Sequence, residues 1–203
     1  MMILSKHINI QANLETYILL TAIGISILAL IPLLRLDWKR YGGLFLASAI
    51  VGNVLCYLFV SLDFYSFPYR LFPKISQMPV TAITLFFPVL VLLSVRYSPR
   101  SWLWKIPFYW VIVHLGMFLE ILFLLNTRLI QYHHTWHLWD SYTWWWIYLL
   151  VFEWIGGKVI PESLRKPLSR KYLRYGTIGW VVIHFVLILT IFLGGYFLGL
   201  LRR

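Results

Sequence analysis

The densest group of potential metal ligands and aromatic rings lies between residues 132 and 146. If this segment is helical, His133 and His137 lie four residues apart and His137 and Asp140 three residues apart, so their side chains share one face. Imidazole and carboxylate groups that converge in this way can bind zinc. Neutral imidazoles and tryptophans are also favoured where a membrane meets water. The interfacial interpretation is preferred over the metal site, and its residues are Tyr132, Trp136, Trp139 and Ser141.

A second group of polar side chains lies inside apolar runs. Counted from the ends of these runs next to the basic loops, His114 and His184 are about eight residues deep and Glu153 about seven, which places all three at roughly 10 to 12 Å. An ionisable side chain inside a bilayer normally faces protein or water. We therefore expect these three residues to line one polar layer. The full set of candidates for a ligand site or polar cavity is His114, Glu153, His184, Asn53, Glu120 and Asn126.

These intramembrane polar groups have two interpretations. A carboxylate and two imidazoles in one layer could exchange protons, or could serve as polar contacts for a bound lipid or small molecule. Alternatively, they form hydrogen bonds between helices, worth about 0.6 kcal/mol each, and fix the register of packing. The sequence leaves both interpretations open.

The composition places the chain in a membrane. Its 203 residues are 61% hydrophobic and 12% charged, with a mean hydropathy of +0.77, and a soluble globule of this size needs more polar surface. The net charge of +11 does not indicate nucleic acid, because Lys and Arg occur in short clusters between apolar runs. Such clusters attract anionic lipid headgroups. We therefore expect the lipid bilayer, with anionic lipid at the basic loops, as the partner.

Hydropathy predicts one all-α transmembrane domain over residues 1–203, since about 20 apolar residues in a helix cross a hydrocarbon core of about 30 Å. Pro88 should kink the third helix. The Gly195-x-x-x-Gly199 spacing in the last helix suits close helix contact, including contact within an oligomer. The six predicted helices comprise about residues 16–34, 43–62, 79–95, 106–126, 143–160 and 176–201.

The distribution of basic residues predicts an orientation in the cell membrane. The loops after the first, third and fifth predicted helices contain twelve of the 18 Lys and Arg residues. Short loops rich in Lys and Arg remain on the cytoplasmic side. We therefore expect the loops 35–42, 96–105 and 158–175 to be cytoplasmic, and both termini to face outward.

A pattern of residues extends through the middle of the chain: Pro79-Val80-Thr81, Phe87-Pro88, Glu120 and Ile130-x-Tyr132-x-x-x-Trp136-x-Leu138-Trp139-x-Ser141. With this pattern, positions 79 to 150 resemble an uncharacterised family of small polytopic membrane proteins from spore-forming Firmicutes. The resemblance implies a helical membrane fold and no particular activity. It includes Glu120, Trp136 and Ser141 but not His133, His134 or Asp140, which shifts the emphasis from a metal site to Glu120.

The chain contains none of the common catalytic motifs: it has no glycine-rich phosphate loop, no His-Glu-x-x-His and no nucleophile elbow. The sequence therefore favours a non-catalytic membrane module that binds a lipid, a small hydrophobic ligand or a partner helix, and it assigns no cofactor. One alternative is a small membrane enzyme acting on lipid or isoprenoid groups, with Glu120, Glu153 and a histidine as acid and base. A small transporter that uses the two glutamates as a relay is a further alternative, weakened by the lack of a visible repeat.

Overall fold

A computed structural model of the chain describes residues 9–133 and 135–168, and beyond them a few residues of the C-terminal segment. The chain divides into two compact units, Met1–Pro167 and Leu168–Arg203. The sixth predicted helix, residues 176–201, falls in the second unit, and its residues His184 and Gly195 lie outside the described part. The described residues from position 181 onward are all helical: Val181, Ile183, Phe185, Ile188, Thr190, Phe192 and Gly199.

The first two long helices follow each other with a single residue between them. Helix α1 spans Leu14–Leu36, helix α2 spans Trp38–Ser61, and Asp37 separates them. The Asp37 carboxylate accepts the backbone N–H of Arg40 at 3.0 Å and so satisfies one of the unpaired donors at the start of α2. The predicted loop over residues 35–42 is therefore wrong, because this cap allows α2 to begin inside the basic cluster.

The third predicted helix, residues 79–95, changes its helix type part-way. A π-helix, η2, spans Ala82–Phe86 and continues directly into helix α3, Phe87–Tyr97. Pro88 follows this π-helical segment and has no N–H to donate to the turn before it. The sequence predicts a kink at Pro88, and the feature that the structure describes there is the π-helical segment just before the proline.

The remaining elements lie on either side of the histidine-rich segment. Helix α4 spans Trp102–Asn126, helix α5 spans Leu138–Val159, and a short 3-10 helix, η3, spans Glu162–Leu164. Helix α5 begins before the predicted residue 143 because the Asp140 carboxylate accepts the His137 N–H at 2.7 Å, which caps the first turn. Two short strands, β1 (Tyr65–Ser66) and β2 (Gln131–Tyr132), pair antiparallel with Tyr65 opposite Tyr132.

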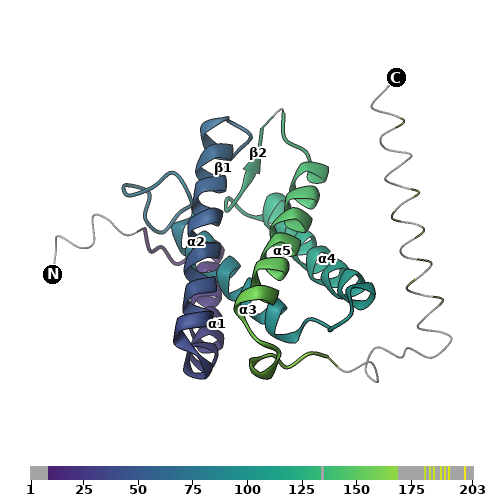
Figure 1. The fold of residues 1–203 in the computed structure, drawn as a ribbon. Coiled ribbons are helices and arrows are strands. Elements are labelled where there is room, and N and C mark those ends of the chain that lie inside the picture. The colour runs from purple at the N-terminus through teal and green to yellow at the C-terminus, as the bar shows by residue number, and fades with distance from the viewer. Residues whose placement is uncertain are drawn as a thin grey trace. The chain divides into compact units, whose positions relative to one another are not determined.

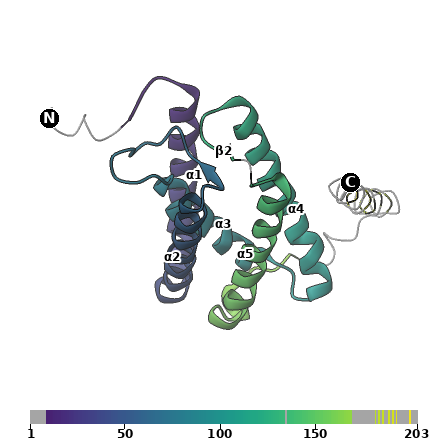
Figure 2. The same ribbon diagram turned by 90° about the horizontal axis from the view of Figure 1, so that it is seen from above.

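Within the first unit, α3 packs between α2 and α5, and α4 packs against α5 (Figure 1). The view from above shows α1 and α2 together on one side and α4 and α5 together on the other (Figure 2). The core lies where these helices meet, and Tyr41, Leu92, Tyr109 and Phe152 are each at most 1% exposed there. Close van der Waals packing of these large side chains holds the helices together.

The connecting segments of this unit gather at two opposite ends. At one end, which we call the basic end (residues 35–41, 96–105 and 158–167), the Leu164 carbonyl accepts the Tyr41 hydroxyl at 2.8 Å and the Arg96 Nη1 at 2.9 Å. At the other, the sheet end (residues 62–81 and 127–137), the strands pair and the Arg128 carbonyl accepts the Tyr69 N–H at 2.8 Å. This grouping agrees with the predicted alternation of the loops.

Among the described residues, three helices are long and apolar enough to cross a membrane: Leu14–Leu36, Trp38–Ser61 and Trp102–Asn126. The combined segment Ala82–Tyr97 is apolar but shorter. Large apolar side chains stand exposed on the long helices, and Leu28 and Leu125 are each 74% exposed. Lipid chains would cover such a surface more favourably than water. The fold is therefore helical with three candidate membrane spans.

Candidate functional site

A pocket of about 320 Å³ opens at the basic end, between the start of α4, the end of α5 and the segment that follows α5. Its lining combines cationic side chains with two carboxylates and two tryptophans. We call it the basic pocket, and its lining residues are Arg100, Trp102, Lys105, Glu153, Trp154, Gly157, Lys158, Ile160, Glu162 and Arg165.

Glu153 is completely buried in this region, and four donors hold its carboxylate. Oε1 accepts the Ser98 hydroxyl at 2.9 Å and Arg165 Nη2 at 3.2 Å, and it also accepts Lys105 Nζ. Oε2 accepts the Tyr109 hydroxyl at 2.6 Å. The donors come from the segment before α4, from α4 itself and from the segment after α5. The carboxylate of Glu153 therefore joins the parts of the chain that build the pocket.

Two tryptophans flank the basic pocket and contact its lysines. Lys158 Nζ lies 3.4 Å from the centre of the Trp154 ring, and Lys105 Nζ lies 4.8 Å from the centre of the Trp102 ring. Such cation–π contacts attract an ammonium group to the ring by about 0.5–1 kcal/mol at exposed sites. Trp154 and Trp102 are 55% and 50% exposed, and exposed tryptophans are typical of the headgroup level of a bilayer.

The basic pocket carries an excess of positive charge. The Arg165 side chain is 10% exposed, and its Nε has no hydrogen-bond partner among the described residues. An unpaired buried N–H is unfavourable, and an oxygen anion would satisfy it. The four cations Arg100, Lys105, Lys158 and Arg165 and the two carboxylates Glu153 and Glu162 give a balance of four minus two, or +2.

The four donors around Glu153 are divided unevenly between its two oxygens. Three bind Oε1 and one, the Tyr109 hydroxyl, binds Oε2, so Oε2 keeps one of its two acceptor positions. Lys105 and Arg165 are partly neutralised by this carboxylate, whereas Lys158 stays free of an ion pair within the described part of the chain and Arg100 pairs only with the exposed Glu162, at 3.3 Å.

A second polar cluster surrounds Glu120 of α4, towards the sheet end. Its carboxylate accepts the Tyr132 hydroxyl at 2.5 Å and Trp145 Nε1 at 2.7 Å. The Ser141 hydroxyl lies 2.8 Å from the Tyr132 oxygen and accepts Trp136 Nε1 at 2.9 Å. Because Tyr132 donates its only proton to Glu120, Ser141 donates to Tyr132. A continuous chain of hydrogen bonds therefore links α4, β2 and the start of α5.

Tyr132 and Trp136 are two of the aromatic members of this cluster, and both are affected by burial. Burial raises the pKa of the Tyr132 phenol, and the neighbouring Glu120 carboxylate raises it further, so Tyr132 remains a donor at neutral pH. Trp136 is 6% exposed, and its ring centre lies 5.0 Å from that of Phe59 and 5.1 Å from that of Phe64. Trp136 is thus packed inside the sheet end. The prediction that it faces the lipid headgroups is wrong.

The predicted polar layer of three residues is not assembled among the described residues. His114 Nδ1 lies 2.8 Å from the Trp110 carbonyl, and its ring packs edge-on against Tyr142 at 5.4 Å. The Glu153 carboxylate instead accepts its hydrogen bonds from residues at and near the basic end. His184, the third member, lies outside the described residues. The predicted common depth of His114 and Glu153 is wrong, because Tyr142, which packs against His114, lies eleven residues before Glu153 on α5, about 16 Å along the helix.

The two predicted asparagines make packing contacts. Asn53 Nδ2 donates to the Ala49 carbonyl at 2.8 Å and to Thr84 Oγ1 at 3.0 Å, which ties α2 to η2. Asn126 Nδ2 donates to the Leu122 carbonyl at 2.9 Å within its own helix. These contacts correspond to the structural interpretation of the intramembrane polar groups.

The predicted metal ligands do not converge. His133 Nδ1 lies 2.9 Å from Asp63 Oδ1 beside the strand pair, whereas His137 and Asp140 form the cap of α5, with 3.6 Å between ring and carboxylate. His134 is outside the described residues. The part of the chain that the structure describes contains no group of three or more His, Cys, Asp or Glu residues able to hold a metal ion.

Sequence reasoning missed most of the residues around Glu153. It assigned Lys105 to a loop that ended just before a helix at residue 106, whereas α4 begins at Trp102. Lys105 and Tyr109 then lie four residues apart on one face of α4, and this spacing was the available signal. Arg165 and Ser98 carried no such signal, because their contacts depend on how the segments fold back.

The chain matches no protein-family model, no curated protein and no solved structure. The resemblance over residues 79–150 stays a prediction. Its matching positions Glu120, Trp136 and Ser141 belong to one hydrogen-bonded cluster, which gives them a shared role in holding α4, β2 and α5 together.

Proposed function

We propose that the chain is a multi-pass protein of the cell membrane that binds an anionic lipid headgroup, without catalysis, in the basic pocket. The observation that carries this proposal is the charge balance of +2 in a pocket flanked by two exposed tryptophans. Phosphate and phosphodiester groups are bound by Arg and Lys. Each basic residue near an anionic surface contributes about 1 kcal/mol of attraction.

The proposal includes six membrane crossings. Besides the three long apolar helices, α5 has 22 residues, which reach about 33 Å in a helix, enough to cross a hydrocarbon core. The shorter segment Ala82–Tyr97 and residues 176–201 supply the other two crossings. The basic end then lies on the cytoplasmic side, where anionic lipids and short Lys- and Arg-rich loops are found together.

Binding is preferred to catalysis because the donors that hold both buried glutamates come from the protein itself. Four donors surround Glu153, two of them cationic. An enzyme acting on lipid or isoprenoid groups would need this glutamate, or Glu120, to exchange a proton with its substrate. Glu120 is likewise held by two donors, Tyr132 and Trp145. Both glutamates therefore serve to position other groups.

Lipid binding by matched charge variants tests the proposal. The double variant Arg100→Gln/Lys158→Gln removes two cations of the pocket and leaves Glu153 and its donors in place. The double variant Arg35→Gln/Lys39→Gln removes two exposed cations at the same end and outside the pocket. Native mass spectrometry of the purified full chain measures retained phosphatidylglycerol against phosphatidylcholine, and inorganic phosphate serves as a soluble competitor.

The pocket variant should bind phosphatidylglycerol about 30-fold more weakly, since two cations at about 1 kcal/mol each are lost, and the control should retain the lipid. Displacement of the lipid by millimolar phosphate would reassign the site to a soluble anion. Equal effects of the two double variants would contradict a specific pocket and leave only general surface attraction.

A further inference from the structure

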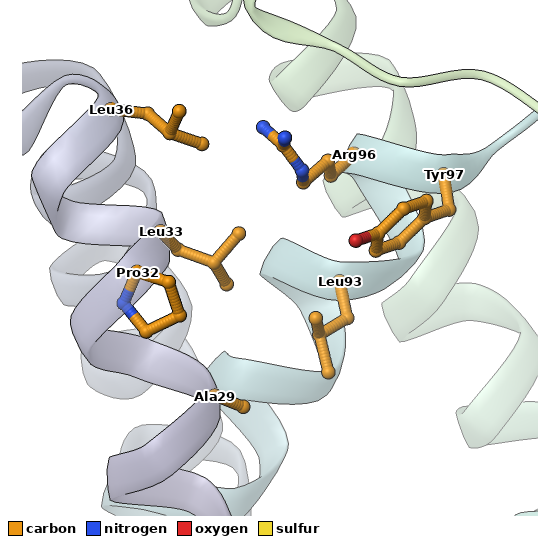
Figure 3. Close-up of a pocket in the computed structure, with 7 residues that line it drawn as sticks. All are labelled: Ala29, Pro32, Leu33, Leu36, Leu93, Arg96 and Tyr97. Carbon is orange, nitrogen blue, oxygen red and sulfur yellow. The ribbon is translucent and has the colours of Figure 1, made fainter.

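A groove of about 330 Å³ separates the C-terminal half of α1 from the end of α3. It shares no lining residue with the basic pocket. Five of its lining residues are apolar, and the two polar ones, Arg96 and Tyr97, lie together in the last turn of α3 (Figure 3). The groove is therefore amphiphilic along its length. Its apolar lining comprises Ala29, Pro32, Leu33, Leu36 and Leu93.

The cation of this groove is held in place from behind. Arg96 Nη1 donates to the Leu164 carbonyl at 2.9 Å and to the Tyr41 hydroxyl at 3.4 Å. Both bonds use one nitrogen of a guanidinium that carries five N–H donors. In Figure 3 the guanidinium extends across the gap towards Leu36, and the Tyr97 hydroxyl is directed into the same gap. Arg96 thus offers a fixed positive charge at the basic end of the groove.

The groove opens on the outward side of a membrane-length helix. Leu36 is 44% exposed and Tyr97 is 36% exposed, so the space is accessible from the surroundings of α1. Pro32 lies inside α1, where it removes one backbone hydrogen bond, and it lines the groove.

We infer that this groove seats one acyl chain of an anionic phospholipid, whose phosphate contacts Arg96 and Tyr97. The apolar lining matches a hydrocarbon chain, and the cation lies at the end where headgroups would be. This lipid is additional to the headgroup in the basic pocket, and its site depends on different residues.

Photolabelling in vesicles tests this inference. The full chain is reconstituted in vesicles that contain phosphatidylglycerol with a diazirine in the acyl chain, and labelled peptides are mapped by mass spectrometry. Ala29→Phe fills the groove and leaves Arg96 with its bonds. Leu28→Phe adds the same ring one residue earlier, where the side chain is 74% exposed, and serves as the matched control.

The expected result is label concentrated in residues 29–36 and 93–97, reduced at least about tenfold by Ala29→Phe and unchanged by Leu28→Phe. Arg96→Gln should lower the labelling about tenfold, as the loss of a charged hydrogen bond predicts, while Arg35→Gln should not. The pocket variant Arg100→Gln/Lys158→Gln should leave groove labelling unchanged, which separates this site from the basic pocket.

Two outcomes would overturn the inference. One is label spread evenly over the outward face of α1 and unaffected by Ala29→Phe, as expected of ordinary bilayer lipid. The other is equal labelling by a phosphatidylcholine analogue, which would remove the role of Arg96 in selecting an anionic headgroup. Because Ala29→Phe keeps the anchoring bonds of Arg96, a folding defect of Arg96→Gln does not weaken the test.

Discussion

The Lys105 ammonium and the Glu153 carboxylate form an ion pair in which the side chains are 7% and 0% exposed. The pair bridges the first turns of α4 and the last turns of α5, and Arg165 adds a second cation at 3.2 Å from the same oxygen. A buried charge is tolerated only when it is paired and hydrogen-bonded. The walls of the basic pocket are therefore held in position by one carboxylate.

Glu153→Gln should strongly destabilise the first unit. The substitution leaves Lys105 and Arg165 without their counter-charge, and breaking a buried ion pair in this way costs about 3–5 kcal/mol. Thermal and denaturant unfolding of the detergent-solubilised chain would measure the loss. Glu162→Gln, which breaks a pair with side chains 72% and 70% exposed, should change little.

A double variant tests whether the loss of stability in Glu153→Gln comes from the unpaired Lys105 ammonium. Lys105→Met combined with Glu153→Gln removes the unpaired ammonium, so the double variant should recover part of the stability lost in Glu153→Gln alone. Equal stability of Glu153→Gln and the wild-type chain would mean that the carboxylate is not needed to hold these charges.

The sequence predicted where Glu153 lies along its helix but not what it binds. Hydropathy identified five of the helical segments of the first unit because each contains a long apolar run. It could not identify the residues at which α2 and α5 begin, because these are set by the side-chain caps of Asp37 and Asp140. The partners of Glu153 come from three separate segments, and no local pattern encodes their convergence.

Gly156→Ala and Gly157→Ala should have opposite effects, although the residues are neighbours on α5. A Cβ on Gly156 would come within 2.6 Å of a Val95 methyl, whereas a Cβ on Gly157 meets nothing within 4 Å. Overpacking a tight contact costs about 1–3 kcal/mol, and alanine in an open helical position gains up to about 1 kcal/mol over glycine. Unfolding midpoints of the two variants provide the comparison, and similar values for both would contradict close packing of α5 on α3.

The orientation proposed for the chain can be measured by cysteine labelling. In a Cys56→Ser background, Ile75→Cys places a thiol at the sheet end and Glu162→Cys places one at the basic end. The native side chains at these positions are exposed, Ile75 to 69% and Glu162 to 70%. A membrane-impermeant maleimide should label Ile75→Cys in intact cells and Glu162→Cys only after permeabilisation, as short basic loops predict. The reverse pattern would place the basic end outside.

The pairing of β1 with β2 is a part of the fold that the sequence did not predict. Each strand has two residues, too few for a recognisable alternation. The predicted alternation of the helices placed both loops at one end of the bundle, and the pairing of Tyr65 with Tyr132 brings the two loops together at the sheet end. The hydrogen bonds between the loops could not be predicted from that alternation.

The titration of Tyr132 should make the first unit less stable at high pH. Burial and the nearby Glu120 carboxylate raise the pKa of its phenol, whereas the unfolded chain has a tyrosine pKa of about 10. The stabilising contribution is complete below about pH 10 and is lost as the pH rises towards the folded pKa, because the unfolded state releases its proton first. The loss is about 1.4 kcal/mol per pH unit for one proton.

Tyr132→Phe separates this effect from the hydrogen bond itself. The variant should be less stable than the wild-type chain at pH 8, because Glu120 and Ser141 lose a partner at 2.5 and 2.8 Å. Above pH 10 its stability should fall less steeply, by about one proton per molecule. Tyr57→Phe, whose side chain is 66% exposed, is the control and should keep the wild-type slope. Unfolding curves recorded from pH 8 upward measure both quantities, and an unchanged slope in Tyr132→Phe would show that this phenol does not titrate differently in the folded state.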